Sequence, residues 1–531
     1  MDIFGKEMQN PPREFELKFK ARASDLAAMK KAVDAHGGGR SAWSTSDLHA
    51  VYYDTPDHRL SSKGVAFRVR QSGDEYVQTI KSDTHDGGAA LHRNEWEYPV
   101  AKQEPDLSLV EPETRRAMGT VLPDELEPAV TVDVKRQKKR ILQMNAFGPD
   151  LEVEAAIDKG TVHAAGKSVR ISECELELIR GEPAAFFEMA LAVQGNTSAR
   201  LSNVSKAATG FALFDDKKPG AVKVPKFLLE HDQTVSDALR NIFGTCVENI
   251  VDNEPVAIDG TDIEGVHQLR VSVRRMRSTL SIVNKLVDPE RVGWLREELK
   301  WLHTSMGPAR DWDVFISETL AVVDGYGIDL DSIDALRRLA EVRRKEAYEL
   351  VRETLNSTRY AQLILRLTGF FETEGWLPRP VTGYHPLIKP LREHAAYLLS
   401  RPYRKLLKEG ENLAEMEMED RHVVRIRLKK LRYAVDFLEN LYPGDETRKF
   451  LKNLRKLQDQ FGYLNDVAQI RHMIAELFEY HDGKIDDEVR LRGAAGLVMG
   501  WHAQHLHMLE SHFLEYWNDF ITTPTFWKKG R

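Results

Sequence analysis

The chain has 531 residues, 42% of them hydrophobic, which is enough for more than one hydrophobic core and therefore for more than one domain. Its formal net charge of −7 excludes a protein that binds nucleic acid through its bulk charge, so any anion site must come from local clusters. Two cysteines are too few for a disulfide framework, and no apolar run approaches the roughly 20 residues of a membrane span. With no signal peptide evident in the first residues, we expect a cytoplasmic protein.

The first 180 residues alternate polar and apolar side chains in the manner of β-strands. Glycine-rich or polar turns separate many of these segments, and amphipathic helices are expected at about 24–35 and 184–194. The expected strands are 13–20, 48–54, 64–71, 75–82, 91–98, 129–144 (one bent strand or two), 151–157 and 168–179. So many strands with one polar face predict a closed antiparallel barrel or a strongly curved sheet.

The polar segment 215–227 contains two prolines and is predicted to be a linker between domains 1–214 and 228–520. Beyond it, apolar residues recur at the spacing of a helical core face. The clearest stripe consists of Leu269, Val273, Met276, Leu280 and Val283. The second domain is therefore predicted to be all-α, and the whole chain an α+β multidomain protein.

The helical part contains an internal repeat. The stretch that begins at His267 matches the stretch that begins at His422, an offset of 422 − 267 = 155 residues. The downstream segments LHTSMGPARD and LQDQFGYLND keep the same offset. We therefore expect two copies of one helical unit, at about 232–385 and 386–520, related by a pseudo-twofold axis.

Each copy places its histidine and several cations along one stripe of a helix. These residues are His267, Arg270, Arg274, Arg275 and Arg277 in the first copy, and His422, Arg425, Lys429, Lys430 and Arg432 in the second. A solvated basic face is the alternative reading. Because clustered cations repel one another unless an anion neutralises them, and because Arg binds phosphate in a bidentate manner, we expect these residues to bind a phosphate chain.

Charged residues also alternate along the expected strands. Segment 13–20 places Glu14, Glu16 and Lys18 on one face and apolar residues on the other. Later segments repeat the pattern with Arg68 and Arg70, Lys81, Arg93, Arg136 and Arg140, Asp158, and Glu173, Glu175 and Glu177. If this face points inward, it builds a tunnel whose glutamates could bind Mg²⁺ or Mn²⁺ and whose cations could bind phosphates. If it points outward, it is an ordinary polar surface.

Two family resemblances follow from these motifs. The repeated H-x-x-R-x-x-x-R-R-x-R stretch, with GPARDWD and GYLND downstream, resembles the CHAD domain over about residues 228–515. E-x-E-x-K at Glu14, with YYDTPDHRL, GVAFRVR, ECELELIRG and Ser205-Lys206, resembles the CYTH family of triphosphate tunnel enzymes over about residues 13–210. The first resemblance implies two four-helix bundles that bind inorganic polyphosphate. The second implies an eight-stranded tunnel, a divalent metal, and hydrolysis or cyclisation of a triphosphate.

The CYTH resemblance also implies roles for individual residues. The metal would sit on Glu14 and Glu16 with one or more of Glu173, Glu175 and Glu177, and Asp158 is a further candidate. Phosphate would be bound by Lys18, Lys20, Arg68, Arg70, Lys81, Arg93, Arg136, Arg140 and Lys206. The residues expected to carry catalysis are Glu14, Glu16, Lys18 and Lys81.

The function that we expect is metal-dependent hydrolysis of inorganic triphosphate to pyrophosphate and phosphate, next to a helical domain that binds inorganic polyphosphate. Alternatives within the same tunnel are hydrolysis of thiamine or nucleoside triphosphates, or synthesis of cyclic AMP. An alternative of another class is a non-enzymatic polyphosphate-binding scaffold. We expect neither nucleic acid nor a membrane as a partner, and the sequence leaves the oligomeric state open.

Overall fold

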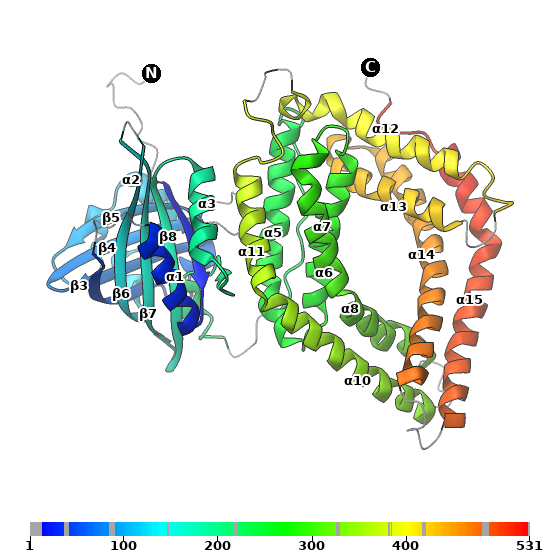
Figure 1. The fold of residues 1–531 in the computed structure, drawn as a ribbon, viewed down its shortest axis with the longest axis horizontal. Coiled ribbons are helices and arrows are strands. Elements are labelled where there is room, and N and C mark those ends of the chain that lie inside the picture. Colours follow the sequence, from blue (N-terminus) through cyan, green and yellow to red (C-terminus); the bar gives the residue numbers. More distant parts are fainter. Residues whose placement is uncertain are drawn as a thin grey trace. The chain divides into compact units, whose positions relative to one another are not determined.

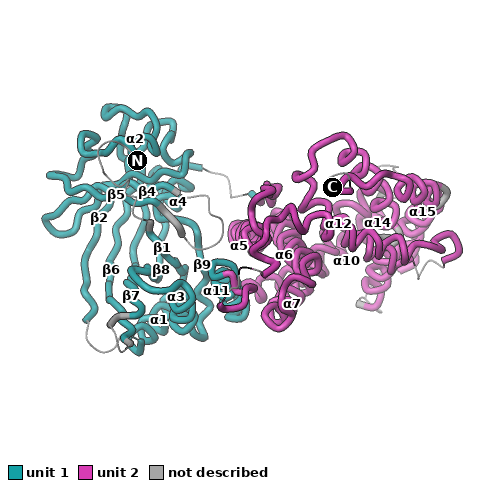
Figure 2. Tube along the Cα trace, turned by 90° about the horizontal axis from the view of Figure 1, so that it is seen from above, with its two compact units in different colours: residues 1–220, 356–373 teal, residues 221–355, 374–531 magenta. Residues whose placement is uncertain are grey.

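The computed structural model describes residues 13–36, 42–83, 91–145, 148–215, 220–324, 330–380, 383, 385–416, 421–480 and 488–528. The chain divides into two compact units, which Figure 2 shows in different colours. Unit 1 comprises residues 1–220 and 356–373, and unit 2 comprises residues 221–355 and 374–531. The main division of the chain follows residue 220, and segment 356–373 joins unit 1 although the sequence surrounds it with helices of unit 2.

Unit 1 is built on an antiparallel sheet of nine strands (Figure 1). The strands are β1 (Arg13–Lys20), β2 (Ser44–Asp54), β3 (Val65–Ser72), β4 (Glu75–Asp83), β5 (Leu91–Val100), β6 (Glu127–Asn145), β7 (Gly148–Ala164), β8 (Lys167–Arg180) and β9 (Arg200–Leu201). Their order is β5-β4-β3-β2-β6-β7-β8-β1-β9, and β1 also pairs with β5.

Each of the eight strands expected from the alternation is present, and β6 runs as one strand. The expected count of eight is corrected to nine, because the two-residue β9 pairs with β1 at Phe19 and Lys20. So short a strand shows no alternation in the sequence. The closed eight-stranded tunnel is not confirmed.

Helices cover one face of this sheet. They are α1 (Ala23–His36), α2 (Pro112–Met118), α3 (Pro183–Gln194) and α11 (Thr358–Glu372). The short helix α4 (Lys206–Phe211) lies instead on the side of the charged residues, since Lys206 and Ala207 line the same cavity as Glu16 and Lys18. On β1, the ring of Phe15 packs edge-on against Phe186 of α3, with ring centroids 5.4 Å apart, and Leu17 and Phe19 are fully buried. Because side chains alternate along a strand, Glu16 and Lys18 then project from the opposite face. The fold thus places an apolar core under α1 and α3 and directs the charged residues of β1 to the other side.

Unit 2 is helical. Its helices are α5 (Val235–Asp259), α6 (Glu264–Ile282), α7 (Pro289–Ser305), α8 (Gly307–Val314), α9 (Ala321–Asp324), α10 (Leu330–Leu355), α12 (Leu391–Glu409), α13 (Arg421–Leu438), α14 (Asp445–Tyr480) and α15 (Glu488–Thr522). A π-helical turn, Phe315–Leu320, follows α8. The predicted core stripe lies on α6 and is buried, and it ends at Val283.

The two copies of the repeated motif form α6 and α13, and these two helices contact one another. Each also packs against the helix that precedes it, α5 and α12 respectively. None of the described helices is long and apolar enough to cross a lipid bilayer.

Candidate active site

A cavity of about 230 Å³ lies on the charged face of the sheet in unit 1. Carboxylates and cations from seven strands and from α4 line it. The carboxylates are Glu14, Glu16, Glu95, Glu97, Glu154, Glu175 and Glu177, and the cations are Lys18, Arg68, Arg70, Lys81, Arg136, Lys138 and Lys206. The alternation seen in the sequence therefore turns these charged residues toward one shared space.

Not every residue expected at this site lines the cavity. Asp158 and Glu173 lie beside it, in contact with Lys206. Lys20 is exposed at the end of β1, and Arg140, with 52% of its side chain exposed, pairs with Glu152 instead. The side chain of Arg93 lies outside the described residues.

The first group of carboxylates is Glu14, Glu16 and Glu177. Glu16 and Glu177 are direct partners across β1 and β8, and Glu177 is also the partner of Glu154 across β7 and β8. Burial, together with the charges of Glu175 and Glu14, raises the pKa of Glu16 to about 8. Burial and the charges of Glu14 and Glu154 raise the pKa of Glu177 to about 7. The surrounding cations therefore compensate these two carboxylates incompletely.

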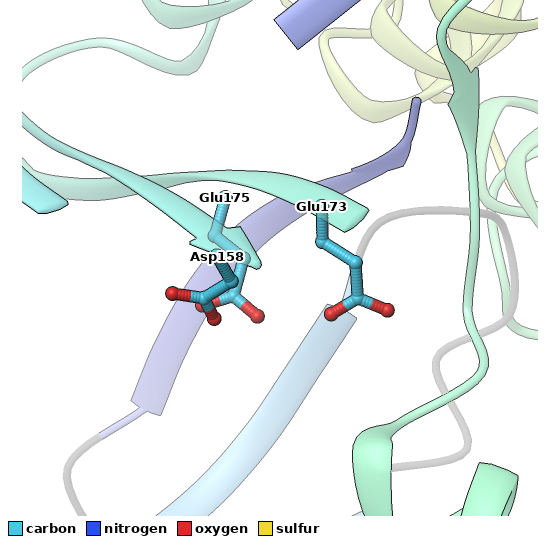
Figure 3. A group of neighbouring side chains, drawn as sticks. All are labelled: Asp158, Glu173 and Glu175. Atoms are coloured by element: carbon cyan, nitrogen blue, oxygen red, sulfur yellow. The ribbon is translucent and has the colours of Figure 1, made fainter. Parts of the chain in front are cut away.

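The second group is Asp158, Glu173 and Glu175, which Figure 3 shows. One carboxylate oxygen from each of them lies within 4.8 Å of the other two. Lys206 Nζ lies 2.8 Å from Asp158, 3.0 Å from Glu173 and 2.5 Å from Glu175. Arg136 adds ion pairs with Asp158 and Glu175. Burial alone would raise the pKa of Glu175, but Arg136 and Lys206 outweigh it and hold that pKa well below its usual range. This group is already neutralised by the protein's own cations.

The remaining cations are paired as well. Lys81 Nζ lies 2.6 Å from Glu14 and 3.2 Å from Glu95. Burial alone would lower the pKa of Lys81, but these two carboxylates outweigh it and raise that pKa. The guanidinium of Arg68 lies 4.0 Å from Glu95. Because the cations are held in place by carboxylates, an entering anion finds them already positioned.

Tyr52 also lines the cavity, although the sequence indicated it only as part of the YYDTPDHRL motif and gave it no role. A tyrosine in an apolar strand is ordinarily a core residue. The register of the sheet makes Tyr52 the direct partner of Arg68 across β2 and β3. Only this pairing, which depends on the turn between the strands, reveals that Tyr52 shares a face with the charged residues.

Basic side chains also cluster in unit 2. A groove of about 510 Å³, called here the basic groove, contains Arg274, Arg277, Lys429 and Lys430 from the repeated motif. It also contains cations that the motif did not indicate, Arg296 and Lys300 of α7, Arg401 and Lys405 of α12, and Arg427 of α13. Arg296 and Lys300 are four residues apart and share a face of α7, and Arg401 and Lys405 do the same on α12. Outside a repeated motif, such a pair of cations is only a weak indication of an anion site in the sequence.

The other expected residues of the repeat lie elsewhere. Arg275 and Arg432 line an adjoining hollow of about 1070 Å³, which shares Arg274 with the basic groove. His267, Arg270, His422 and Arg425 line neither of these two spaces. The Arg270 guanidinium donates a hydrogen bond to the carbonyl oxygen of His303 at 2.7 Å.

Comparisons with known proteins agree with the two units. The family model of the CYTH domain matches residues 12–211, and that of the CHAD domain matches residues 241–475. An uncharacterized protein of Mycobacterium tuberculosis (strain H37Rv) is 25% identical over 413 residues, which cover 73% of this chain and 75% of that protein. An inorganic triphosphatase of Haemophilus influenzae is 26% identical over 168 residues, which cover 31% of this chain and 46% of that enzyme.

Among solved structures, the CHAD domain from the plant Ricinus communis is 26% identical with a TM-score of 0.48, and the match covers 58% of this chain and 99% of that one. On the matches of the two family models, the chain carries a CYTH domain at residues 12–211, followed by a CHAD domain at residues 241–475.

Proposed function

We propose that the CYTH domain hydrolyses inorganic triphosphate to pyrophosphate and phosphate with the help of Mg²⁺ or Mn²⁺. The observation that carries this proposal is one cavity that combines under-compensated carboxylates with a set of positioned cations. The distant similarity to an inorganic triphosphatase supports it. In this proposal the sheet acts as a tunnel, since β1 pairs with β8 and also with β5.

The metal would be held by Glu14, Glu16 and Glu177. Carboxylate oxygens are the donors that Mg²⁺ and Mn²⁺ prefer, and the raised pKa values of Glu16 and Glu177 indicate a place where added positive charge is favourable. Asp158, Glu173 and Glu175 fit a metal less well, because Lys206 and Arg136 already occupy their oxygens. When bound, a divalent cation would neutralise phosphate charge and polarise a phosphoryl oxygen.

The phosphates would be bound by Lys18, Arg68, Arg70, Lys81, Arg136 and Lys206, which line the cavity. Arg68 and Arg70 can each offer two parallel N–H groups to phosphate oxygens. Lys206 and Lys81 stay protonated, because the neighbouring carboxylates raise their pKa values despite burial. These cations would hold the substrate in line and stabilise the charge that develops on the leaving pyrophosphate.

Orthophosphate release from tripolyphosphate with each divalent metal tests this function. Glu16→Gln is expected to lower the rate by at least about 10-fold, because loss even of a group that only orients a metal ligand costs about 10- to 100-fold. The matched control is Glu152→Gln, because Glu152 lies on β7 close to the cavity but pairs with Arg140 outside it. ATP and thiamine triphosphate should be assayed in the same way. If the protein hydrolyses either of them faster than tripolyphosphate, that compound and not inorganic triphosphate is its preferred substrate.

We further propose that the CHAD domain binds inorganic polyphosphate in the basic groove. The groove's lining contains nine cations and a single carboxylate, Glu297. Polyphosphate binding should weaken as salt rises and fall in an Arg277→Gln, Lys300→Gln, Lys405→Gln triple variant. Arg492→Gln is the control, since Arg492 is exposed on α15 and pairs with Glu488. Unchanged binding in the triple variant would contradict this assignment.

A further inference from the structure

The helix α4 carries Lys206 into the cavity and is too short to hold its own position. Lys206 is its first residue, and the ammonium group contacts Asp158, Glu173 and Glu175. A helix of six residues is not stable by itself, because most helical stability in proteins comes from packing against other elements. The contacts that α4 makes with its surroundings therefore decide where Lys206 Nζ lies.

The far end of α4 packs against the turn that follows β2. The ring of His58 in this turn lies edge-on to Phe211 and Phe214, with ring centroids 5.3 Å and 4.7 Å apart. Phe211 is the last residue of α4, and its ring stacks on that of Phe214 at 6.2 Å. We call His58, Phe211 and Phe214 the aromatic cluster. Edge-to-face pairs of this kind are favourable beyond the apolar surface that they bury.

The turn that carries His58 has a fixed shape, because a buried carboxylate holds it. Asp54 is fully buried, and its carboxylate oxygens accept hydrogen bonds from backbone N–H groups of the turn. The donors are Thr55 and Leu60, at 2.8 Å each, and Ser61, at 2.9 Å. His58 itself has a φ of 57°, in the left-handed region that residues other than glycine seldom adopt unless the surroundings impose it. The turn therefore presents the His58 ring at a defined place.

The middle of α4 lies close against the sheet, so the helix moves as one piece. An added Cβ atom at Gly210 would collide with the side chain of Val130 on β6. Ala207 belongs to the same buried apolar cluster as Val130, and Phe211 packs against that cluster. Because closely packed interiors transmit displacements, a shift at the Phe211 end of α4 would also displace Lys206.

We propose that His58 is a positioning residue for phosphate binding, because it holds the far end of α4 and thereby fixes Lys206 Nζ in the cavity. The inference rests on the proposed function, in which Lys206 binds a phosphate of the substrate. His58 does not line the cavity, so it acts through Lys206 and not through contact with the substrate. Without the aromatic cluster, the ammonium group would occupy its binding position for less of the time, and the phosphate would bind less tightly.

The test is a double-mutant cycle that combines His58→Asn with Lys206→Gln. Asparagine adopts the left-handed conformation readily, so His58→Asn removes the ring without adding backbone strain. Phe214→Ala removes the cluster from the other side, and Phe214→Tyr keeps the ring. His163→Asn is the control, since this half-exposed histidine of β7 lies beside Asp133 on the sheet. Melting temperatures show which variants fold.

The first readout is the dissociation constant of a tripolyphosphate analogue that has methylene groups in place of both bridging oxygens and cannot be hydrolysed. The second is KM and kcat for tripolyphosphate, and Mg²⁺ or Mn²⁺ is present in both. His58→Asn and Phe214→Ala should each raise the dissociation constant by about 10- to 10²-fold. They should raise KM more than they lower kcat, because Lys206 binds phosphate before the reaction as well as during it. Phe214→Tyr and His163→Asn should stay near wild type, and His58→Asn should have almost no further effect in the Lys206→Gln background.

An equal effect of His58→Asn in the wild-type and Lys206→Gln backgrounds would overturn the inference, since His58 would then act by another route. Unchanged binding in both His58→Asn and Phe214→Ala would overturn it too, and would leave the proposed hydrolysis standing. If the wild-type protein binds the analogue but leaves tripolyphosphate intact with every divalent metal, the proposed function fails, and the cycle on binding still decides the role of His58. If the wild-type protein neither binds nor hydrolyses, both proposals fail.

Discussion

At the residue scale, the properties of the cavity in unit 1 depend on how far neighbouring cations neutralise each of its carboxylates. The cavity region holds two groups of acidic residues, and both are rich in carboxylate oxygens. Lys206 and Arg136 neutralise the group around Glu175, whereas Glu16 and Glu177 keep raised pKa values. The two groups therefore differ in the amount of positive charge nearby rather than in the number of carboxylates, and this difference is the reason for proposing the metal at Glu16 and Glu177.

This imbalance predicts how stability depends on pH without metal. The pKa of Glu16 rises from an ordinary 4.5 to about 8 on folding, so the folded state holds a proton that the unfolded state loses. Stability should therefore fall as pH rises from about 4.5 to about 8. Between pH 6 and pH 8.5 the contribution of Glu16 is on the order of 2 kcal/mol. Thermal melting in the presence of a chelator measures it.

Glu16→Gln should flatten this fall, because an amide does not titrate, while Glu152→Gln should keep it. Addition of Mg²⁺ or Mn²⁺ should reduce the fall in the wild-type protein. If the wild-type protein and Glu16→Gln lose stability equally over this pH range, the neighbouring cations neutralise the Glu16 carboxylate and its pKa is not raised on folding.

Much of this site could be predicted from alternation alone. Glu14, Glu16 and Lys18 had to share a face once strand 13–20 was recognised. The choice among Glu173, Glu175 and Glu177 could not be made, because it depends on which residue lies opposite Glu16 across β8. Register is set by turns and long-range pairing, which a single sequence does not display.

At the element scale, α11 joins the sheet unit although the sequence places it among the helices of unit 2. Its helical periodicity predicts a helix but does not name the surface against which the helix packs. The contact with α3 is close, since a Cβ atom added at Gly369 would lie 2.8 Å from the ring of Phe187. Gln362 also donates to the carbonyl oxygen of Gly195 at 2.7 Å.

Gly369→Ala should therefore destabilise unit 1 by about 1–3 kcal/mol, as overpacking does. The control is Gly293→Ala on α7, where an added Cβ would meet nothing within 4 Å. That change should be neutral or slightly stabilising, because alanine favours a helix over glycine. Thermal melting of both variants measures the difference. Equal melting temperatures would show that α11 does not depend on close contact with α3.

The arginines of the repeated motif on α6 lead to a prediction for the pKa of a neighbouring histidine, His303. Burial and the charges of Arg270, Arg277 and Arg274 lower the pKa of His303 to about 3. A bound polyphosphate would offset these charges, so the pKa of His303 should rise when polyphosphate is added. NMR titration of the imidazole signals measures the shift, and His512, exposed on α15, is the control. An unmoved His303 would argue against phosphate binding near this stripe.

At the scale of the whole molecule, two charged sites occur in a chain whose net charge is −7. One lies in the CYTH domain and the other in the CHAD domain, and each is built from residues of its own unit. The repeat and the two domain types could be predicted from motifs. The pseudo-twofold relation of the two copies remains a prediction, and so do the domain limits that we expected.

Because each site is complete within one unit, the two proposed activities should be separable. Glu16→Gln should stop hydrolysis of tripolyphosphate and leave binding of long polyphosphate intact. The Arg277→Gln, Lys300→Gln, Lys405→Gln triple variant should have the reverse effect. Parallel assays of orthophosphate release and polyphosphate binding check this. Loss of both properties in either variant would show that one site serves both.

The most direct test of the proposed site is tripolyphosphate hydrolysis as a function of Mn²⁺ or Mg²⁺ concentration. The wild-type protein should release orthophosphate only with metal, and Glu177→Gln should require at least about 10-fold more metal for half-maximal rate. Glu173→Gln should leave that metal requirement nearly unchanged, because Lys206 occupies this carboxylate. Intact tripolyphosphate with every divalent metal, or a larger metal requirement in Glu173→Gln than in Glu177→Gln, would contradict the account.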